Sequence, residues 1–128
     1  MATNDEMTVQ VSLPEAGGLL DYIEHKWYRL QEELGGWISP ETEGRMEEMM
    51  AMLDLHSALC RTGDDGRTVT ASRELLETLL REGGEYAREV LASALTGEYD
   101  DDSVTKAFTS KGLMRLADRE GFYEGVVV

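Results

Sequence analysis

The chain has 128 residues, of which 41% are hydrophobic and 30% charged, and its 26 acidic and 12 basic side chains give a net charge of −14. Such an acidic surface repels phosphate groups, which argues against direct binding of nucleic acid or of an anionic membrane. No apolar run approaches the roughly 18 residues of a membrane span, and the polar start of the chain does not resemble a signal peptide. We therefore expect one cytoplasmic helical domain over residues 1–128.

The first and last segments of the chain have β character. The first segment is residues 1–12, near the end of which Val9, Val11 and Leu13 occupy every second position. The last segment is residues 122–128, which end in three valines. Alternation of this kind is typical of a strand with one buried face. The two segments are predicted to form a small β-ribbon with each other, to pair with a neighbouring subunit, or to be flexible.

A first helix is predicted from about Pro14 or Leu19 to Leu34. Its apolar residues recur at intervals of three and four, which is typical of a helix that packs against another helix. Gly35 and Gly36 are expected to end it, because glycine adopts the left-handed C-cap conformation without steric cost. The apolar stripe consists of Leu20, Ile23, Trp27, Leu30 and Leu34.

A second helix is predicted to begin at Ser39 and Pro40, a capping hydroxyl followed by a proline at the first helical position, and to end near Arg61. Its apolar residues cover more than one face, which indicates a central helix or one shared with another chain. Trp37, just before it, either packs as a hydrophobic staple or anchors a partner. The predicted partner contacts are Met46, Met49, Met50, Met52, Leu55, Leu59 and Trp37.

A polar loop and a short extended stretch lead to a third helix, capped by Thr70 or Ser72. Gly83 and Gly84 are expected to separate it from a fourth helix, which ends at Gly97. The residues expected to face inward are Leu75, Leu76, Leu79, Leu80, Ala87, Val90, Leu91, Ala94 and Leu95.

A fifth helix is predicted from Asp102 or Ser103 to about Arg119, with a bend or break at Gly112. Its inward residues are expected to be Val104, Phe108, Leu113, Leu116 and Ala117. Together the segments predict an all-α fold, a compact bundle of about five helices with at most a minor β-ribbon formed by the terminal segments.

Four potential metal ligands form two pairs with helical spacing: Asp21 with His25, and His56 with Cys60. If the two helices pack antiparallel, these side chains could converge on zinc. However, Cys60 is the only cysteine, and neither histidine lies in the Glu-x-x-His motif of di-iron bundles. We therefore expect no metal and no other cofactor.

Acidity itself could be functional if carboxylates imitate the phosphates of DNA in the basic cleft of another protein. Negative charge is spread evenly along the chain, and only a few acidic residues are concentrated. These are Asp100, Asp101 and Asp102, with Glu47 and Glu48 in the second predicted helix.

The sequence contains no convergent catalytic set. Glycine-rich phosphate-binding loops are absent. Asp54, His56 and Ser57 cannot form a nucleophile with its base, because adjacent residues of a helix point in different directions. The sequence therefore predicts a non-enzymatic helical interaction protein, an accessory subunit, adaptor or regulator, which binds a protein partner and forms a homodimer. An acidic inhibitor of a nucleic-acid-binding protein and a metal-binding helical protein are the alternatives.

Overall fold

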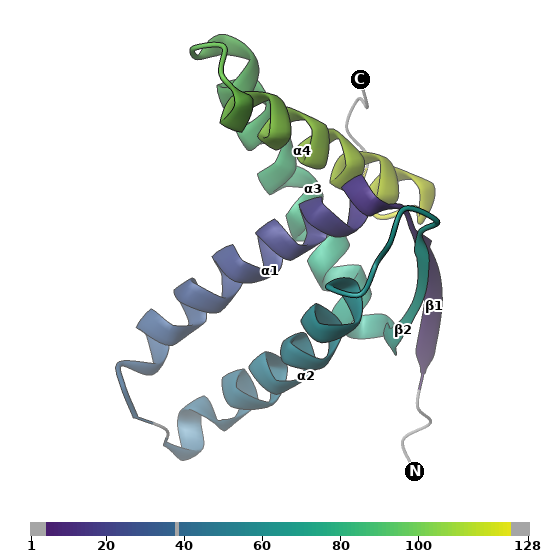
Figure 1. The fold of residues 1–128 in the computed structure, drawn as a ribbon. Helices are drawn as coiled ribbons and strands as arrows, with labels where there is room; N and C mark the ends of the chain where they lie inside the picture. Colours follow the sequence, from purple (N-terminus) through teal and green to yellow (C-terminus); the bar gives the residue numbers. More distant parts are fainter. Residues whose placement is uncertain (1–4, 38, 124–128) are drawn as a thin grey trace.

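The computed structural model describes residues 5–37 and 39–123. Within these residues it contains four α-helices, a 3-10 turn and a two-stranded antiparallel sheet (Figure 1). The predicted helical class is confirmed, but the number of helices is four rather than five. No helix in this part of the chain combines the length and apolar character needed to cross a membrane. The elements are β1 (Glu6–Val11), α1 (Leu13–Leu34), η1 (Pro40–Thr42), α2 (Glu43–Leu59), β2 (Arg67–Ser72), α3 (Arg73–Thr96) and α4 (Asp101–Arg119).

The β-ribbon pairs β1 with β2, with Val9 opposite Val69. Both valines and Val11 are buried, so one face of the ribbon contributes to the core. The prediction of strand character near the N-terminus is confirmed, whereas its partner is the extended stretch before α3. Residues 124–128, which include the valines of the other predicted strand, lie outside the described residues.

Helix α1 begins with a capping box formed by Ser12 and Glu15. The Ser12 amide donates to Glu15 Oε1 at 2.9 Å, and the Glu15 amide donates to Ser12 Oγ at 3.4 Å. Glu15 also accepts a hydrogen bond of 2.9 Å from Arg119 at the end of α4. The helix ends at Gly35, whose φ of 65° is left-handed, as the sequence predicts.

Helix α3 runs without interruption through Gly83 and Gly84, so the predicted third and fourth helices are one. These glycines are buried and admit neighbouring side chains close to the helix backbone. A Cβ atom on Gly83 would lie 3.3 Å from the Tyr22 ring, and one on Gly84 would lie 2.7 Å from the Tyr123 ring. The glycine pair therefore permits close packing and does not end the helix.

Helices α1 and α4 also cross at glycines. A Cβ atom on Gly112 would lie 2.8 Å from the carbonyl oxygen of Pro14, and one on Gly18 would lie 2.7 Å from Leu113 Cβ. Gly112 therefore lies in an unbroken α4, and the predicted break at this position is wrong. The contact with α1 lies in the second half of α4. The beginning of α4 and the end of α3 therefore extend beyond the crossing of α1 and α4 (Figure 1).

Candidate functional site

Most of the apolar side chains predicted to contact a partner are buried within the protein's own core. Met49, Met52, Leu55 and Leu59 are all buried, because α2 packs against α1, β2 and α3 of the same chain. The wide apolar surface of α2 thus reflects its central position and leaves these four residues unavailable to a partner.

The rest of that predicted set is more accessible. Met50 on α2 and Trp37 in the loop after α1 are exposed, and Met46 is half-buried. Trp37 therefore does not act as a buried staple. The accessible part of the predicted contact set consists of single side chains and does not form a continuous stripe along α2.

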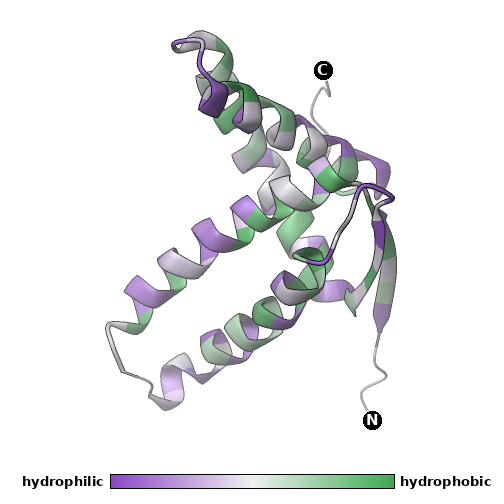
Figure 2. Ribbon diagram, viewed as in Figure 1, coloured by the Kyte–Doolittle hydropathy of each residue, from purple (hydrophilic) through white to green (hydrophobic). Residues whose placement is uncertain are grey.

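A continuous apolar surface is found instead where the α3–α4 hairpin extends beyond α1. Leu95, Tyr99, Val104 and Phe108 are 67%, 92%, 44% and 64% exposed, respectively. They line one groove of about 530 Å³, and among the described residues that line it only Lys111 is charged. We call these four residues the hairpin-tip surface; Figure 2 shows hydrophobic bands continuing into this part of the hairpin.

Three predictions about this surface are wrong: Leu95, Val104 and Phe108 were expected to face inward but are exposed. They are exposed because α1 covers only the second half of α4, where Leu113, Leu116 and Ala117 are buried as predicted. With side-chain areas of about 150–250 Å² for the aromatic residues, the four side chains expose on the order of 500 Å². This area is comparable with the largest apolar patches of typical monomers, about 300–600 Å², which are often functional.

A second apolar groove, of about 290 Å³, lies between α1 and α2. We call it the α1–α2 groove. Tyr28 and Leu53 are its exposed apolar lining residues, and Glu24 is also exposed. The remaining lining residues are Ile23, Trp27, Met52 and His56.

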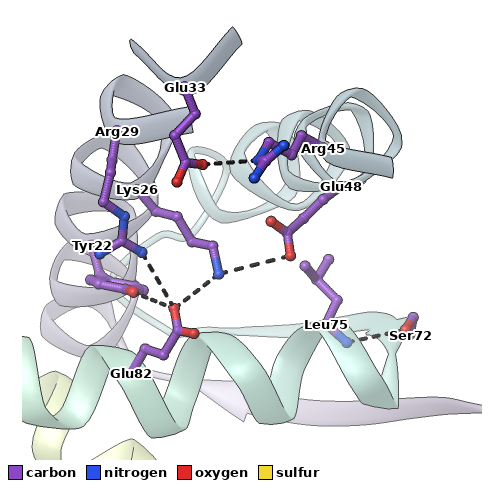
Figure 3. A network of polar contacts seen from close by, with 9 residues as sticks. All are labelled: Tyr22, Lys26, Arg29, Glu33, Arg45, Glu48, Ser72, Leu75 and Glu82. Carbon is purple, nitrogen blue, oxygen red and sulfur yellow. Dashed lines mark hydrogen bonds and ion pairs between the residues drawn. The ribbon is translucent and has the colours of Figure 1, made fainter. Parts of the chain in front are cut away.

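Another face of α1 takes part in a polar network that joins three helices (Figure 3). Lys26 is only 4% exposed. Its Nζ lies 2.9 Å from Glu82 Oε1 on α3 and 3.8 Å from Glu48 Oε2 on α2. Tyr22 donates a hydrogen bond of 2.6 Å to Glu82, and Arg29 approaches the same carboxylate at 3.8 Å. The network therefore ties α1, α2 and α3 together around a buried ammonium group.

The network shifts the pKa values of Glu82 and Tyr22. Burial alone would raise the pKa of Glu82, but hydrogen bonds from Tyr22 and Lys26, with the charges of Lys26 and Arg29, lower this pKa below its ordinary value. The pKa of Tyr22 is raised by burial and by its hydrogen bond to the Glu82 carboxylate. Glu82 is therefore held in its charged form opposite Lys26.

We expect Glu82→Gln to lower the free energy of unfolding at pH 7 by about 1–2 kcal/mol, because Lys26 loses its nearest carboxylate while Glu82 is itself partly exposed to solvent. Since folding lowers the pKa of Glu82, its contribution is present above the unfolded pKa and is lost as the pH falls through the folded pKa. Urea denaturation at neutral and acidic pH should show that the difference in the free energy of unfolding between the wild type and Glu82→Gln becomes smaller in acid. Glu77→Gln is the control, because Glu77 is similarly exposed but pairs with the exposed Arg81 and not with a buried lysine. An unchanged difference in acid would contradict the assignment.

The four predicted metal ligands lie in two separate pairs. Asp21 and His25 are exposed on α1, where the His25 ring stacks on Tyr86 of α3 with 4.5 Å between ring centroids. His56 Nδ1 lies 3.6 Å from Cys60 Sγ on α2. Within residues 5–37 and 39–123, no three histidine, cysteine or acidic side chains are arranged to hold a metal ion.

Cys60, His56 and Glu24 form the arrangement nearest to a catalytic one. His56 Nε2 lies 3.9 Å from Glu24 Oε1, on the far side of the ring from the thiol. However, Cys60 is exposed at the C-cap of α2 and is not among the described residues that line the neighbouring α1–α2 groove. The geometry therefore gives no support for thiol chemistry.

Three of the five acidic residues singled out in the sequence stabilise their own chain. Asp100 caps α4 by accepting a 2.7 Å hydrogen bond from the Ser103 amide, and Asp102 pairs with Lys106 at 3.1 Å. Glu48 lies near Lys26 in the polar network. The two others, Asp101 and Glu47, are exposed. A dedicated acidic binding surface is not evident from these contacts.

No protein-family model matches the chain, and no curated protein or solved structure shows significant similarity to it. Evidence of function therefore comes from the surfaces of the chain itself. The hairpin-tip surface and the α1–α2 groove are the two candidates.

Proposed function

We propose that this protein is a non-enzymatic interaction module, of the kind that serves as an accessory subunit, adaptor or regulator, and that it forms a homodimer through the hairpin-tip surface. The observation that carries the proposal is the grouping of Leu95, Tyr99, Val104 and Phe108 in one exposed groove. Burying exposed aromatic and aliphatic side chains away from water lowers the free energy, and such patches are typical of interaction sites.

The distribution of charge is compatible with this dimer, although each copy carries a net charge of −14. Among the described residues that line the groove, only Lys111 is charged, so no carboxylate lies within the groove itself. Glu98, Asp100, Asp101 and Asp102 flank the groove and are exposed, so two copies repel each other there, and this repulsion is screened by salt. We therefore expect self-association to strengthen as salt is raised.

The area available predicts a moderate affinity. Two copies would bury about 1,000 Å² from the four side chains alone, and flanking residues would bring the contact towards the roughly 1,200–2,000 Å² of stable interfaces. Part of the gain is offset by lost translational and rotational freedom. We expect a dissociation constant in the micromolar range, which corresponds to a free energy of binding on the order of −8 kcal/mol.

Phe108→Glu is expected to weaken dimerisation by at least about 30-fold, because it places a charge at the centre of the contact. Light scattering across a concentration series measures this change. Met50→Glu is the matched control, since Met50 is similarly exposed but lies on α2 and the net charge changes equally. A wild-type protein that stays monomeric at high micromolar concentration would overturn the dimer, and an equal effect of both variants would place the contact elsewhere.

A further inference from the structure

We propose that the α1–α2 groove binds a basic amphipathic helix supplied by a different protein. This inference goes beyond the proposed self-association, because it uses other helices and a different kind of occupant. It rests on the shape of the groove and on the distribution of charge along its edges.

The groove offers an apolar floor between two neighbouring helices. Ile23 and Trp27 come from α1 and Met52 from α2, while Tyr28 and Leu53 stand exposed at the edges. Figure 1 shows α1 and α2 as two arms that project from the rest of the molecule. A third helix lying along the groove could insert apolar side chains spaced at i, i+3 or i+4, and i+7.

The two helices that form the groove are strongly acidic. Together α1 and α2 contain nine acidic and three basic residues, a net charge of −6. All three basic side chains are directed to carboxylates: Lys26 and Arg29 to Glu82 on α3, and Arg45 to Glu33 at 3.1 Å. Their positive charge is therefore not free to balance the groove edges.

Carboxylates lie along the α1 edge of the groove. Glu24 lines the groove, and Glu32 is placed on the same side of α1 because both are four residues from Tyr28. Among the ion pairs of the described residues, none joins either carboxylate to a lysine or arginine, and Glu24 lies 3.9 Å from His56.

An apolar floor bordered by carboxylates, in a pair of helices with a net charge of −6, favours an occupant with an apolar face flanked by lysine or arginine. A second copy of this chain is disfavoured in the groove, because its own α1 and α2 would bring further carboxylates against these edges. Charge complementarity therefore selects a basic helix here, whereas the groove of the hairpin tip, whose described lining residues include no carboxylate, suits a second copy.

A synthetic helix of leucine and lysine, about 18 residues or five turns long, is a suitable probe for the full chain. In a Trp37→Phe background, Trp27 is the only tryptophan, and it lines the groove. Binding of the tryptophan-free peptide is expected to shift Trp27 emission to the blue as water is displaced. Affinity should fall at least about tenfold between low and high salt, and a leucine–glutamate peptide of the same pattern should not bind.

Leu53→Lys and Leu95→Lys separate groove binding from general attraction to an acidic protein. Both replace an exposed leucine and change the net charge equally, but only Leu53 lines the groove. Leu53→Lys is expected to weaken peptide binding at least about tenfold and Leu95→Lys less than about twofold. Equal losses, no binding, or binding without a change in Trp27 emission would overturn the proposal.

The same two variants keep this proposal distinguishable from self-association. Leu95→Lys changes the hairpin-tip surface and should weaken the dimer in light scattering, while Leu53→Lys should leave the dimer intact. A protein that binds the peptide through the groove yet remains monomeric would overturn only the dimer. A dimeric protein that ignores the peptide would overturn only the groove.

Discussion

Replacing Gly18 with alanine is expected to destabilise the protein by about 3 kcal/mol, which is towards the upper end for the insertion of a methyl group into a packed contact. The added Cβ would overlap the carbonyl oxygen of Thr109 on α4 and lie 2.7 Å from Leu113 Cβ. A backbone oxygen cannot rotate away as the end of a side chain can. Helix α4 would therefore have to move relative to α1, which disturbs the core around both helices.

Gly44→Ala is the matched control for this prediction. Gly44 lies in α2, and a Cβ atom there would meet nothing within 4 Å. Alanine should stabilise the helix at this position by about 0.5–1 kcal/mol, because glycine loses more backbone entropy on folding. Urea denaturation of both variants measures the two effects, and a Gly18→Ala protein as stable as the wild type would contradict the close crossing of α1 and α4.

Met52→Ala and Met50→Ala are expected to differ sharply although the residues are two positions apart on one helix. Met52 is 0% exposed and Met50 is 59% exposed. Removal of the buried thioether should cost about 2–4 kcal/mol, from lost burial and the cavity left behind. Removal of the exposed one should change the free energy of unfolding by less than about 0.5 kcal/mol.

Denaturant unfolding at low protein concentration, where the dimer is dissociated, is the appropriate measurement for this pair. It tests whether α2 is part of the core of one protomer or an excess apolar helix that another chain covers. Comparable losses for the two variants, or a loss larger at Met50, would show that the methionines of α2 are buried differently.

The sequence predicts well where the first and last helices end, because the signals for these ends are local. The glycines after Leu34 end α1, and α4 ends at Arg119 as expected. The capping box of Ser12 and Glu15 was a readable sequence signal for the true start of α1. Such signals require only neighbouring residues and therefore survive without knowledge of the packing.

The glycine pairs show where local signals are insufficient. Gly35 adopts a left-handed conformation that ends a helix, whereas Gly83 and Gly84 lie inside α3, where Tyr22 and Tyr123 approach the helix closely. The two pairs are identical as dipeptides. Only the rings that come from distant parts of the chain distinguish a helix end from a packing contact.

The candidate surfaces were missed for the same reason. Periodicity correctly identifies apolar faces on α2, α3 and α4, but it does not say which neighbour covers each face or how far that cover extends. Met52 is covered by the protein's own core, while Phe108 lies beyond the α1–α4 crossing. The position of that crossing depends on Gly18 and Gly112, whose steric function appears only in three dimensions.

Hydrogen exchange at two protein concentrations tests most directly whether the hairpin tip is the surface through which the protein associates. Above the dissociation constant, backbone amides in residues 91–108 should exchange more slowly than in dilute protein, because the dimer suppresses opening of the hairpin tip. Amides of α1 and α2 should exchange equally at both concentrations. Identical exchange of residues 91–108 at the two concentrations, or added protection confined to α1 and α2, would contradict the proposed function.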